Sequence, residues 1–282
     1  MSVKTSKTQI DRLGDRLKEG SHTESDLRLL EDYRRSFGEA YESVLRTIRQ
    51  RGEFPTGRLA KSTRSIAEKL RRESIRLSQM QDIAGCRVVV ANISKQEQFI
   101  ASLKADFLGA SVIDRRDKPS YGYRAVHIIA MISGKPVEIQ VRTSLQHLWA
   151  ELSEKSSDVL DPTIKYGGGP AAWRRVLTSG SELVAAHEEC EEALSEKAAA
   201  YQVAAAAHED FKKAAVEYLE AHPPRNEAQK TRRELKKSTR EMERAEQEMQ
   251  ESRKDLVNSW NRTADSLKQA ISWLDKQKGK KQ

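Results

Sequence analysis

Two short stretches of the sequence decide the fold: QDIAGCRVVV at residues 81–90 and KPVEIQVRT at residues 135–143. The β-branched run after Gly85 in the first stretch predicts a buried strand, because branched side chains pack well on a pleated sheet. The second stretch alternates apolar and polar residues, and side chains that alternate along a strand face opposite sides of the sheet. One face is expected to carry Val137, Ile139 and Val141, and the other Glu138, Gln140 and Arg142.

Helical and extended patterns surround these two stretches. Apolar residues with a helical period predict helices over residues 24–50, 63–73, 96–105 and 145–159. Extended segments are expected over residues 86–90, 110–115, 124–132 and 135–142. Ser133-Gly134, between the last two segments, is typical of a β-hairpin turn. The predicted fold class is therefore α+β, with a sheet flanked by helices.

The last hundred residues, roughly, differ in kind from the rest of the chain. Residues 182–220 are rich in Ala and Glu with apolar positions near a heptad, and an apolar residue then recurs every seven residues from Leu235 to Leu256. Residues 222–226 contain two prolines, which end a helix. Two long helices around this turn predict an antiparallel, coiled-coil-like hairpin, packed against itself or a partner. Residues 276–282 are expected to be frayed.

Composition and charge narrow the classes of function. The chain has 282 residues, 37% apolar and 33% charged, and it contains no run of about eighteen apolar residues, which argues against a membrane-spanning segment. The N-terminus lacks a signal-peptide core, and Cys86 and Cys190 lack metal-ligand spacing, so we expect a cytoplasmic protein with reduced thiols. Residues 51–180 hold 21 basic and 13 acidic side chains, which accounts for the whole net charge of +8. Such a field attracts phosphates on nucleotides or RNA, although a solvated basic surface gives the same pattern.

Polar side chains stand at positions where core residues would be expected. Asp82 precedes the strand at residues 86–90, and Glu138 shares one face of the hairpin strand with Gln140 and Arg142. Two carboxylates beside substrate phosphates form a ligand set that Mg²⁺ accepts. Taken alone, the alternation is more typical of the solvent-facing side of an ordinary hairpin.

The segment KPSYGYRAVH at residues 118–127 strengthens the case for a site. Its Gly and Pro let a loop backbone approach a ligand closely. Tyr123 offers a ring on which a base can stack, and His127 offers a polar group further along the strand. A plain turn with an edge tyrosine is the alternative interpretation.

Taken together and in order, three blocks of the chain resemble the synthetase domain of the RelA/SpoT family of alarmone synthetases. The first block contains Arg58, Lys61, Ser65 and Lys69, the second is residues 81–88, and the third joins residues 118–127 to residues 137–143. The helix LQHLWAEL at residues 145–152 also fits. The resemblance covers residues 25–170 and implies a nucleotidyltransferase-like mixed β-sheet flanked by helices.

The resemblance also implies a reaction in which a 3′-hydroxyl attacks the β-phosphorus of ATP and AMP leaves. It implies that Asp82 binds Mg²⁺ and that Glu138 is the general base or a second metal ligand. The implied ATP-binding residues are Arg58 and Arg87 around the adenine, Lys61 and Lys69 at the phosphates, and Ser65. The implied acceptor-binding residues are Tyr123, which stacks on the base, and His127, Gln140, Arg142 and Lys118. Metal and basic side chains suit this chemistry because a pyrophosphoryl group must be neutralised before an oxygen approaches it.

The acceptor is less well defined than the reaction. GDP or GTP is the usual acceptor of the family, and the product is a (p)ppGpp-type alarmone. The loop before Lys118 is short, however, and residues 120–127, 145–152 and 165–169 resemble the toxic small alarmone synthetases more closely. That branch includes enzymes that pyrophosphorylate the 3′-CCA end of tRNA and others that make adenosine alarmones. An inactive nucleotide- or RNA-binding adaptor is the alternative from a different class.

We expect three parts: an N-terminal helical or flexible segment at residues 1–23, a RelA/SpoT-like pyrophosphotransferase domain at residues 24–180, and a helical hairpin at residues 181–282. The chain has no His-Asp pair, so the hydrolase half of long family members is not expected and the synthetase needs another restraint. The hairpin is interpreted as a scaffold or a homo-oligomer contact. Binding of an antitoxin or another regulatory protein is the sharper hypothesis.

Overall fold

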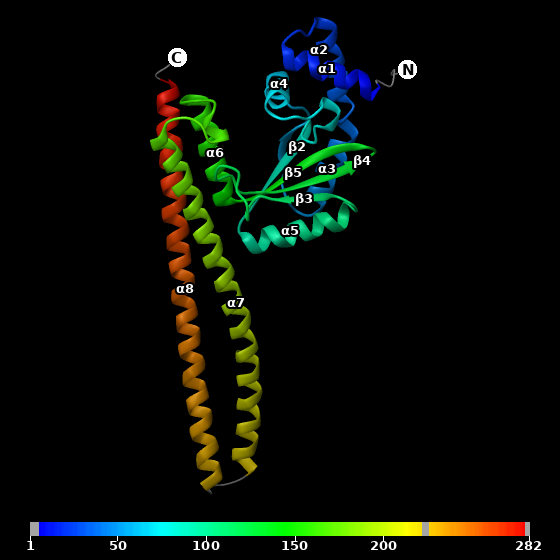
Figure 1. Cartoon of the computed structure of the whole chain (residues 1–282). Helices are drawn as coiled ribbons and strands as arrows, with labels where there is room; N and C mark the ends of the chain where they lie inside the picture. Colours follow the sequence, from blue (N-terminus) through cyan, green and yellow to red (C-terminus); the bar gives the residue numbers. More distant parts are fainter. Residues whose placement is uncertain (1–5, 222–225, 280–282) are drawn as a thin grey trace.

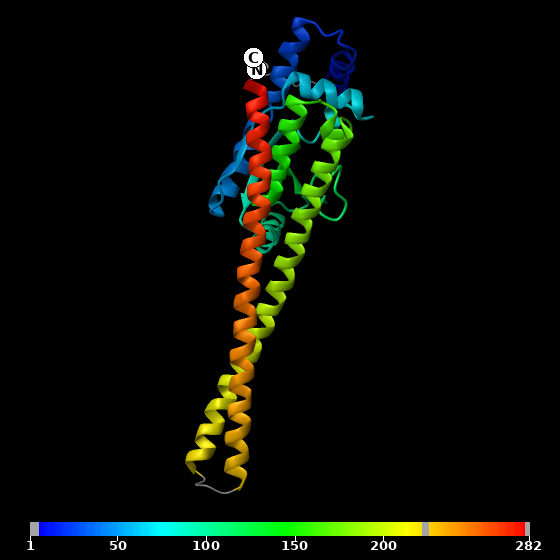
Figure 2. The same ribbon diagram turned by 90° about the vertical axis from the view of Figure 1, so that its left-hand side faces the viewer.

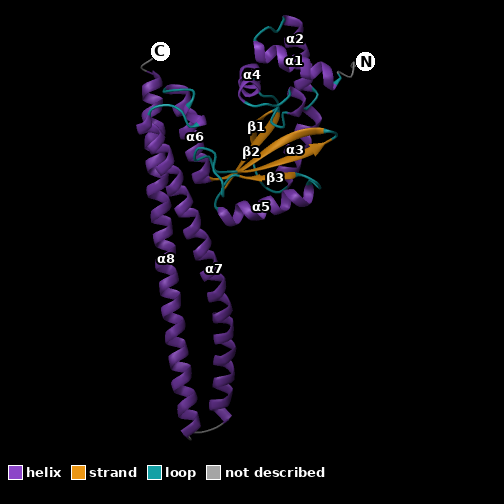
Figure 3. Ribbon diagram, in the orientation of Figure 1, coloured by secondary structure: helices purple, strands orange, loops and turns teal. Residues whose placement is uncertain are grey.

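A five-stranded mixed sheet and a long helical hairpin dominate the structure, a computed structural model that describes residues 6–221 and 226–279 (Figure 1). The strands are β1 (Thr56–Arg58), β2 (Ala84–Val90), β3 (Ser111–Asp114), β4 (Val126–Ile132) and β5 (Lys135–Thr143). The helices are α1 (Lys7–Glu19), α2 (Glu24–Arg35), α3 (Gly38–Gln50), α4 (Thr63–Arg72), α5 (Ile93–Asp106), α6 (Ser144–Val159), α7 (Ala171–Ala221) and α8 (Asn226–Gly279), with 3₁₀ turns η1 (Leu77–Gln79) and η2 (Ile164–Tyr166). Figure 3 shows the strands gathered in one layer with helices around it. The predicted α+β class, with its mixed sheet and C-terminal hairpin, is confirmed.

The strands lie in the order β1-β2-β5-β4-β3, which places β5 at the centre of the sheet. β2 and β5 are parallel, whereas the other three pairs are antiparallel. The register sets Arg87 and His127 on either side of Gln140, so three polar side chains form one row across the sheet. In the next row, Gly85 lies opposite Glu138. The polar residues of three strands therefore meet on one face.

The opposite face of the sheet is apolar and buried. Val137, Ile139 and Val141 are fully buried, as their alternation with polar residues predicts. They share one hydrophobic core with residues of β2 and β4 and with the buried residues of α3 and α5. Burial fixes the register, because a slip of one residue would bring Glu138 and Gln140 into this core. The polar face is thereby held away from the core.

Local signals set the ends of several elements. The β4–β5 hairpin turns at Ser133 and Gly134, whose φ angles of 49° and 77° match a two-residue type I′ turn. The prediction of one helix over residues 24–50 is wrong, because α2 ends at Arg35 and α3 begins at Gly38. The hydroxyl of Ser36 donates to the carbonyl oxygen of Tyr33 at 2.5 Å, a local bond that competes with the helix.

Helices α7 and α8 form the predicted antiparallel hairpin, which extends far beyond the sheet in Figure 1 and Figure 2. The rings of Trp173 and Trp273 stack with centroids 5.8 Å apart. The Nδ1 atom of His208 lies 2.8 Å from the hydroxyl oxygen of Ser238. These two contacts are separated by 35 residues on each helix, or five heptads, so a single register holds along the hairpin.

The root of the hairpin packs against the α+β part of the chain. Helix α7 begins at Ala171, so the domain boundary expected at residue 181 falls inside one continuous helix. Buried residues of α6, α7 and α8 form a second hydrophobic core, which includes Trp149, Val184 and Leu267. The hairpin is therefore anchored through its root, while its distal part points away from the body.

The ends and turns of the chain are described in part. Helix α1 lies within the segment expected to be helical or flexible, and Ser6 caps its N-terminus. The turn expected at residues 222–226 lies almost wholly outside the described residues. Of the end expected to be frayed, residues 276–279 belong to α8, and residues 280–282 lie outside the described residues. Within the described part of the chain, no helix is long and apolar enough to cross a membrane.

Candidate active site

A pocket of about 660 Å³ opens on the polar face of the sheet, with α4 along one side and α6 and η2 along the other. Its lining comes from β1, α4, β2, β5, α6 and η2 and from the loops between them. The predicted site residues that line it are Arg58, Lys61, Ser65, Lys69, Asp82, Arg87, Glu138, Gln140 and Arg142. The fold thus brings together the two carboxylates and the full predicted set of ATP-binding residues.

Asp82 lies in the turn before β2 and faces two lysines of the same pocket. Lys61 donates from Nζ to Oδ2 of Asp82 at 2.6 Å, and Lys69 donates from Nζ to Oδ1 at 3.0 Å. The backbone N–H of Lys61 also donates to the carbonyl oxygen of Ile83 at 2.8 Å, which ties its loop to the start of β2. Burial raises the pKa of the Asp82 carboxyl, but the two lysines outweigh burial, and the pKa lies below its ordinary value. Asp82 is therefore ionised at neutral pH.

Glu138 is held through both of its carboxylate oxygens. His127 Nδ1 lies 2.8 Å from Oε1, and Gln140 donates from Nε2 to Oε2 at 2.8 Å. Burial raises the pKa of the Glu138 carboxyl and Asp82 adds to that effect, yet the bonds from His127 and Gln140 bring the pKa below its ordinary value. Glu138 is therefore ionised as well, and each of its oxygens can still accept a further bond.

Tyr123 is joined to the pocket by two hydrogen bonds. Its hydroxyl lies 2.8 Å from His127 Nε2 and accepts from Arg142 Nη2 at 2.9 Å. Burial raises the pKa of the Tyr123 hydroxyl, and Arg142 opposes the rise. Arg142 is only 2% exposed, and its Nε and Nη1 atoms find no hydrogen-bond partner among the described residues. Buried N–H groups without partners are costly, so these two groups of Arg142 carry an unsatisfied hydrogen-bonding demand.

Arg58 and Arg87 reach the pocket from adjacent strands. β1 and β2 are antiparallel, with Arg58 opposite Gly85. The strands approach so closely at Gly57 that an added Cβ atom would lie 2.6 Å from the Cα atom of Cys86. This close approach explains the glycine, and the side chains of Arg58 and Arg87 both line the pocket.

Three predicted acceptor-binding residues are not part of the pocket lining. Tyr123 and His127 connect to it through their bonds to Arg142 and Glu138. Lys118 is exposed in the loop between β3 and β4 and is separate from this cluster of contacts. The structure therefore groups Tyr123 and His127 with the site, whereas Lys118 is not among the residues that line the pocket.

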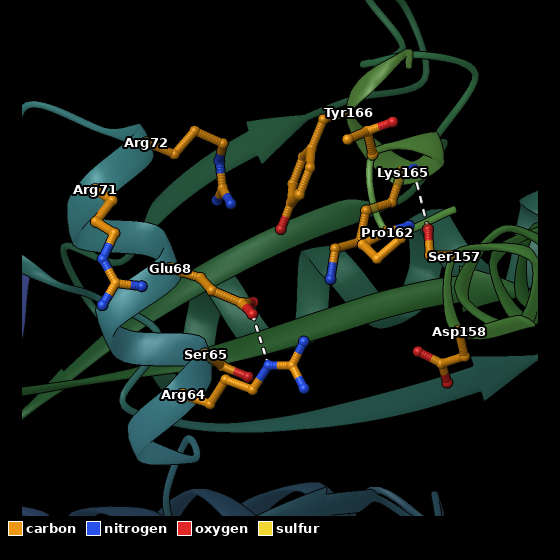
Figure 4. Close-up of a pocket in the computed structure, with 11 residues that line it drawn as sticks. Arg64, Ser65, Glu68, Arg71, Arg72, Ser157, Asp158, Pro162, Lys165 and Tyr166 are labelled. Atoms are coloured by element: carbon orange, nitrogen blue, oxygen red, sulfur yellow. Dashed lines mark hydrogen bonds and ion pairs between the residues drawn. The ribbon is translucent and has the colours of Figure 1, made fainter. Parts of the chain in front are cut away.

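A second pocket, of about 690 Å³, adjoins the first and was missed by sequence reasoning. Figure 4 shows side chains of α4 facing Lys165 and Tyr166 of η2 across this pocket. The guanidinium carbon of Arg72 lies 4.0 Å from the centroid of the Tyr166 ring. Arg72, Lys165 and Tyr166 line both pockets, so the two spaces share a wall. The KYGGG stretch at residues 165–169 marks this region in the sequence, but it does not reveal the approach of α4.

The donor set of the main pocket fits Mg²⁺. Mg²⁺ binds through one or two carboxylates and takes its remaining ligands from water and substrate phosphates. Asp82 and Glu138 supply two ionised carboxylates in one pocket that also contains lysines for phosphates. Across residues 6–221 and 226–279, no three His, Cys, Asp or Glu side chains are grouped so that they could hold a metal ion by themselves. The set present therefore fits an ion that a nucleotide helps to hold.

Solved structures and curated sequences show similarity to the chain. Crystal structures of small alarmone synthetase 1 from Bacillus subtilis, bound to its product pppGpp or to AMPCPP, are both 26% identical in sequence. The first covers 63% of this chain and 100% of its own, with a TM-score of 0.45, and the second covers 59% and 93%, with a TM-score of 0.41. Uncharacterized proteins of Mycobacterium tuberculosis and Mycobacterium bovis are 39% identical over 115 residues, which is 39% of this chain. The match spans 42% of the length of these relatives.

A family model gives the clearest comparison. Residues 57–157 match the model of the region found in RelA/SpoT proteins. This region runs from β1 to α6 and includes the predicted site residues from Arg58 to Arg142. Residues 57–157 of the chain are therefore similar to the region found in RelA/SpoT proteins.

Proposed function

We propose that this domain transfers a pyrophosphate group from ATP to the 3′-hydroxyl of a guanosine nucleotide, GDP or GTP. The observation that carries the proposal is the meeting of Asp82 and Glu138 in one pocket with Lys61 and Lys69. Two ionised carboxylates beside two ammonium groups suit a reaction on a polyphosphate, because the carboxylates take a metal ion and a proton while the lysines hold phosphate oxygens.

ATP binding in this proposal exchanges the partners of Asp82. The phosphates of ATP attract Lys61 and Lys69 away from the carboxylate that they contact in the structure. The oxygens of Asp82 are then free for Mg²⁺, which when bound would neutralise phosphate charge and polarise the β-phosphorus. Arg58 and Arg87 hold the adenine between them, since a planar guanidinium stacks on rings and stays charged.

Glu138 is the proposed proton acceptor. The 3′-oxygen forms a bond to the β-phosphorus of ATP, the bond from that phosphorus to the oxygen bridging to the α-phosphate breaks, and AMP leaves. The proton of the 3′-hydroxyl passes to a carboxylate oxygen of Glu138. His127 and Gln140 hold that carboxylate in one orientation through their 2.8 Å contacts. An alternative role for Glu138 as a second Mg²⁺ ligand uses the same position.

The acceptor side of the site is built around Tyr123 and Arg142. The Tyr123 ring is the proposed stacking surface for the guanine base, and base–aromatic stacking contributes on the order of 1–3 kcal/mol. Arg142 lines the pocket and donates to the Tyr123 hydroxyl, so its guanidinium charge is proposed to attract the acceptor phosphates. Lys118 lies in the loop between β3 and β4, so this side chain would have to approach the acceptor from that loop.

An RNA 3′ end, such as the CCA end of tRNA, is the second candidate acceptor. The pocket next to the site supports this candidate, because it is lined by Tyr166 and by the basic residues Arg64, Arg71, Arg72 and Lys165. Phosphate contacts with such residues give affinity that does not depend on base sequence. An adenosine nucleotide acceptor would use the same two pockets.

A transfer assay tests the proposal. The purified chain is incubated with Mg²⁺ and ATP labelled at the γ-phosphate, together with GDP, GTP, an adenosine nucleotide or deacylated tRNA. Label in GDP or GTP supports the proposed reaction, and label in tRNA alone supports the second candidate. If no acceptor takes label while ATP still binds, the domain is an adaptor and the proposed activity is wrong.

A further inference from the structure

Helix α7 contacts the loop that carries Tyr123 on both sides of that residue. We call residues 118–125 the acceptor loop. The hydroxyl of Ser181 donates to the carbonyl oxygen of Gly122 at 2.8 Å. Arg124 donates from Nε and Nη2 to Oε2 of Glu188 at 3.0 Å and 2.7 Å. Ser181 and Glu188 are separated by about two helical turns, so they lie on one face of α7.

The ion pair between Arg124 and Glu188 is buried, and both carboxylate oxygens of Glu188 accept hydrogen bonds. Glu188 is 6% exposed, and its other oxygen accepts from Nε2 of Gln146 at 2.5 Å. Gln146 belongs to the first turn of α6, where it forms a capping box with Thr143. A buried charge that loses its partner is strongly destabilised, so Arg124 and Glu188 hold each other in place. The acceptor loop is thus fixed to the junction of α6 and α7.

Packing reinforces these bonds at Gly122. Its φ angle is 87°, and an added Cβ atom would lie 2.7 Å from the ring of Trp149. Trp149 in turn donates from Nε1 to the carbonyl oxygen of Leu177 in α7 at 2.8 Å. The acceptor loop therefore lies directly against two helices that also form the root of the hairpin.

We propose that Ser181 and Glu188 are positioning residues for the acceptor, which act by holding Tyr123 in place. The inference rests on the proposed function, because it assigns Tyr123 to the acceptor. The proposed ATP-binding residues come from β1, α4, β2 and the loop between β1 and α4, none of which Ser181 or Glu188 contacts in the hydrogen bonds above. A displacement of α7 at its root therefore changes acceptor binding and leaves ATP binding unchanged. Helix α7 therefore connects the hairpin to the acceptor side of the site.

Kinetic measurements separate a positioning role from a general structural one. Ser181→Ala and Glu188→Gln are each expected to raise the KM for the acceptor about tenfold, because small displacements of a positioned group are costly. The KM for ATP is expected to stay within about twofold, since its side of the site is untouched. The matched control is Glu191→Gln on the same helix, where Glu191 accepts from the backbone N–H of Ile93 at 3.2 Å. This control is expected to change neither constant.

Hydrogen exchange gives a second test that does not need activity. Amides of the acceptor loop, including that of Tyr123, which donates to the carbonyl oxygen of Ser120 at 3.0 Å, are expected to exchange faster in both variants. Amides of β5 are expected to exchange at the same rate as in the unaltered chain. Glu191→Gln is expected to leave the loop protected.

The outcomes distinguish this inference from the proposed function. If the unaltered chain transfers label but the variants keep the same acceptor KM and loop protection, the positioning role is wrong. If the unaltered chain transfers label to no acceptor, the proposed function is wrong, and loop exchange still decides whether α7 holds the loop. Should Glu188→Gln fail to fold, Arg124→Gln combined with Glu188→Gln removes both charges, and the same loop-specific increase in exchange is required.

Discussion

Lys61 Nζ lies 2.6 Å from Oδ2 of Asp82, in the pocket that also holds Glu138. With Lys69 at 3.0 Å from the other oxygen, the carboxylate lies between two ammonium groups. The two lysines therefore compensate the negative charge of Asp82 inside a partly buried site. A nucleotide must compete with Asp82 for contacts with these lysines. This arrangement links metal binding to phosphate binding, because the loss of the lysines exposes the oxygens of Asp82.

The first prediction concerns Asp82→Asn. Transfer is expected to fall about 100-fold or more, since the substitution removes a proposed metal ligand at a site of charge development. Binding of ATP without Mg²⁺ is expected to stay the same or to tighten, because Lys61 and Lys69 lose a competing anion. Calorimetric titration in the presence of a chelator measures that binding, and the label assay measures transfer.

The matched control for this substitution is Asp275→Asn. Asp275 pairs with Lys155 at 2.7 Å, and the side chains are 55% and 35% exposed. Exposed ion pairs contribute about 0–1 kcal/mol, so transfer and ATP affinity are expected to remain near those of the unaltered chain. Full transfer activity in Asp82→Asn would contradict the role proposed for Asp82.

The second prediction compares two substitutions at Tyr123. Tyr123→Ala is expected to raise the acceptor KM about tenfold or more, because it removes a stacking surface that contributes on the order of 1–3 kcal/mol. Tyr123→Phe keeps the ring and loses only the bonds to His127 and Arg142, so a smaller rise is expected. The KM for ATP is measured in parallel. Equal rises for both substrates in Tyr123→Ala would show that the ring is structural.

Some parts of the site can be predicted from the sequence because they depend on a local, periodic pattern of apolar and polar residues. The alternation in β5 is sufficient to place Glu138, Gln140 and Arg142 on one face, since a strand offers two faces only. The apolar period over residues 24–50, by contrast, does not reveal the break at Ser36. Buried residues of α2 and α3 face the same hydrophobic core, so the pattern continues across two separate helices.

Other parts depend on how distant elements pack, which no local period encodes. Glu188 reaches Arg124 only because α7 starts at Ala171 and runs along α6. The approach of Arg72 to Tyr166 depends in the same way on the positions of α4 and η2. The resemblance to a family supplied the pairing of Asp82 with a distant glutamate, but it did not supply these contacts.

The third prediction uses two glycines to separate backbone strain from steric overlap. Gly134→Ala is expected to lower the free energy of unfolding by about 1–2 kcal/mol, because its φ of 77° disfavours a side chain and no atom lies within 4 Å of the added Cβ. Gly122→Ala adds an overlap with Trp149 at 2.7 Å, so a loss of about 3 kcal/mol is expected. Denaturant unfolding measures both. Equal losses would show that the acceptor loop moves freely away from Trp149.

The fourth prediction concerns the two thiols. Burial raises the pKa of the Cys86 thiol to about 12, and Glu138 adds to the rise, so almost no thiolate forms at neutral pH. Cys190 is exposed on α7. An aromatic disulfide reagent at pH 8 is therefore expected to modify Cys190 alone in the folded chain and both thiols after denaturation. Cys190→Ser should abolish the fast reaction, and a fast reaction that persists in this variant would contradict the burial of Cys86.

The last prediction separates the root of the hairpin from its distal part. A deletion of residues 182–282 removes Val184, Leu267 and Leu274 from the core around Trp149. Each buried side chain of this kind contributes about 1.5–3 kcal/mol, so the deletion is expected to unfold the chain or to lower its Tm by more than about 10 °C. Loss of activity in that variant would therefore say nothing about regulation.

A shortened hairpin avoids this loss of stability. Replacement of residues 201–245 by a short glycine-rich turn keeps the register set by the contact of Trp173 with Trp273 and leaves the second core intact. We propose that residues 24–180 act as the catalytic unit together with this root, so the shortened chain is expected to keep its transfer rate within about twofold and its Tm within about 5 °C. The label assay and thermal unfolding measure these values. A shortened chain that folds with the same Tm but transfers much more slowly would show that the distal hairpin takes part in the reaction.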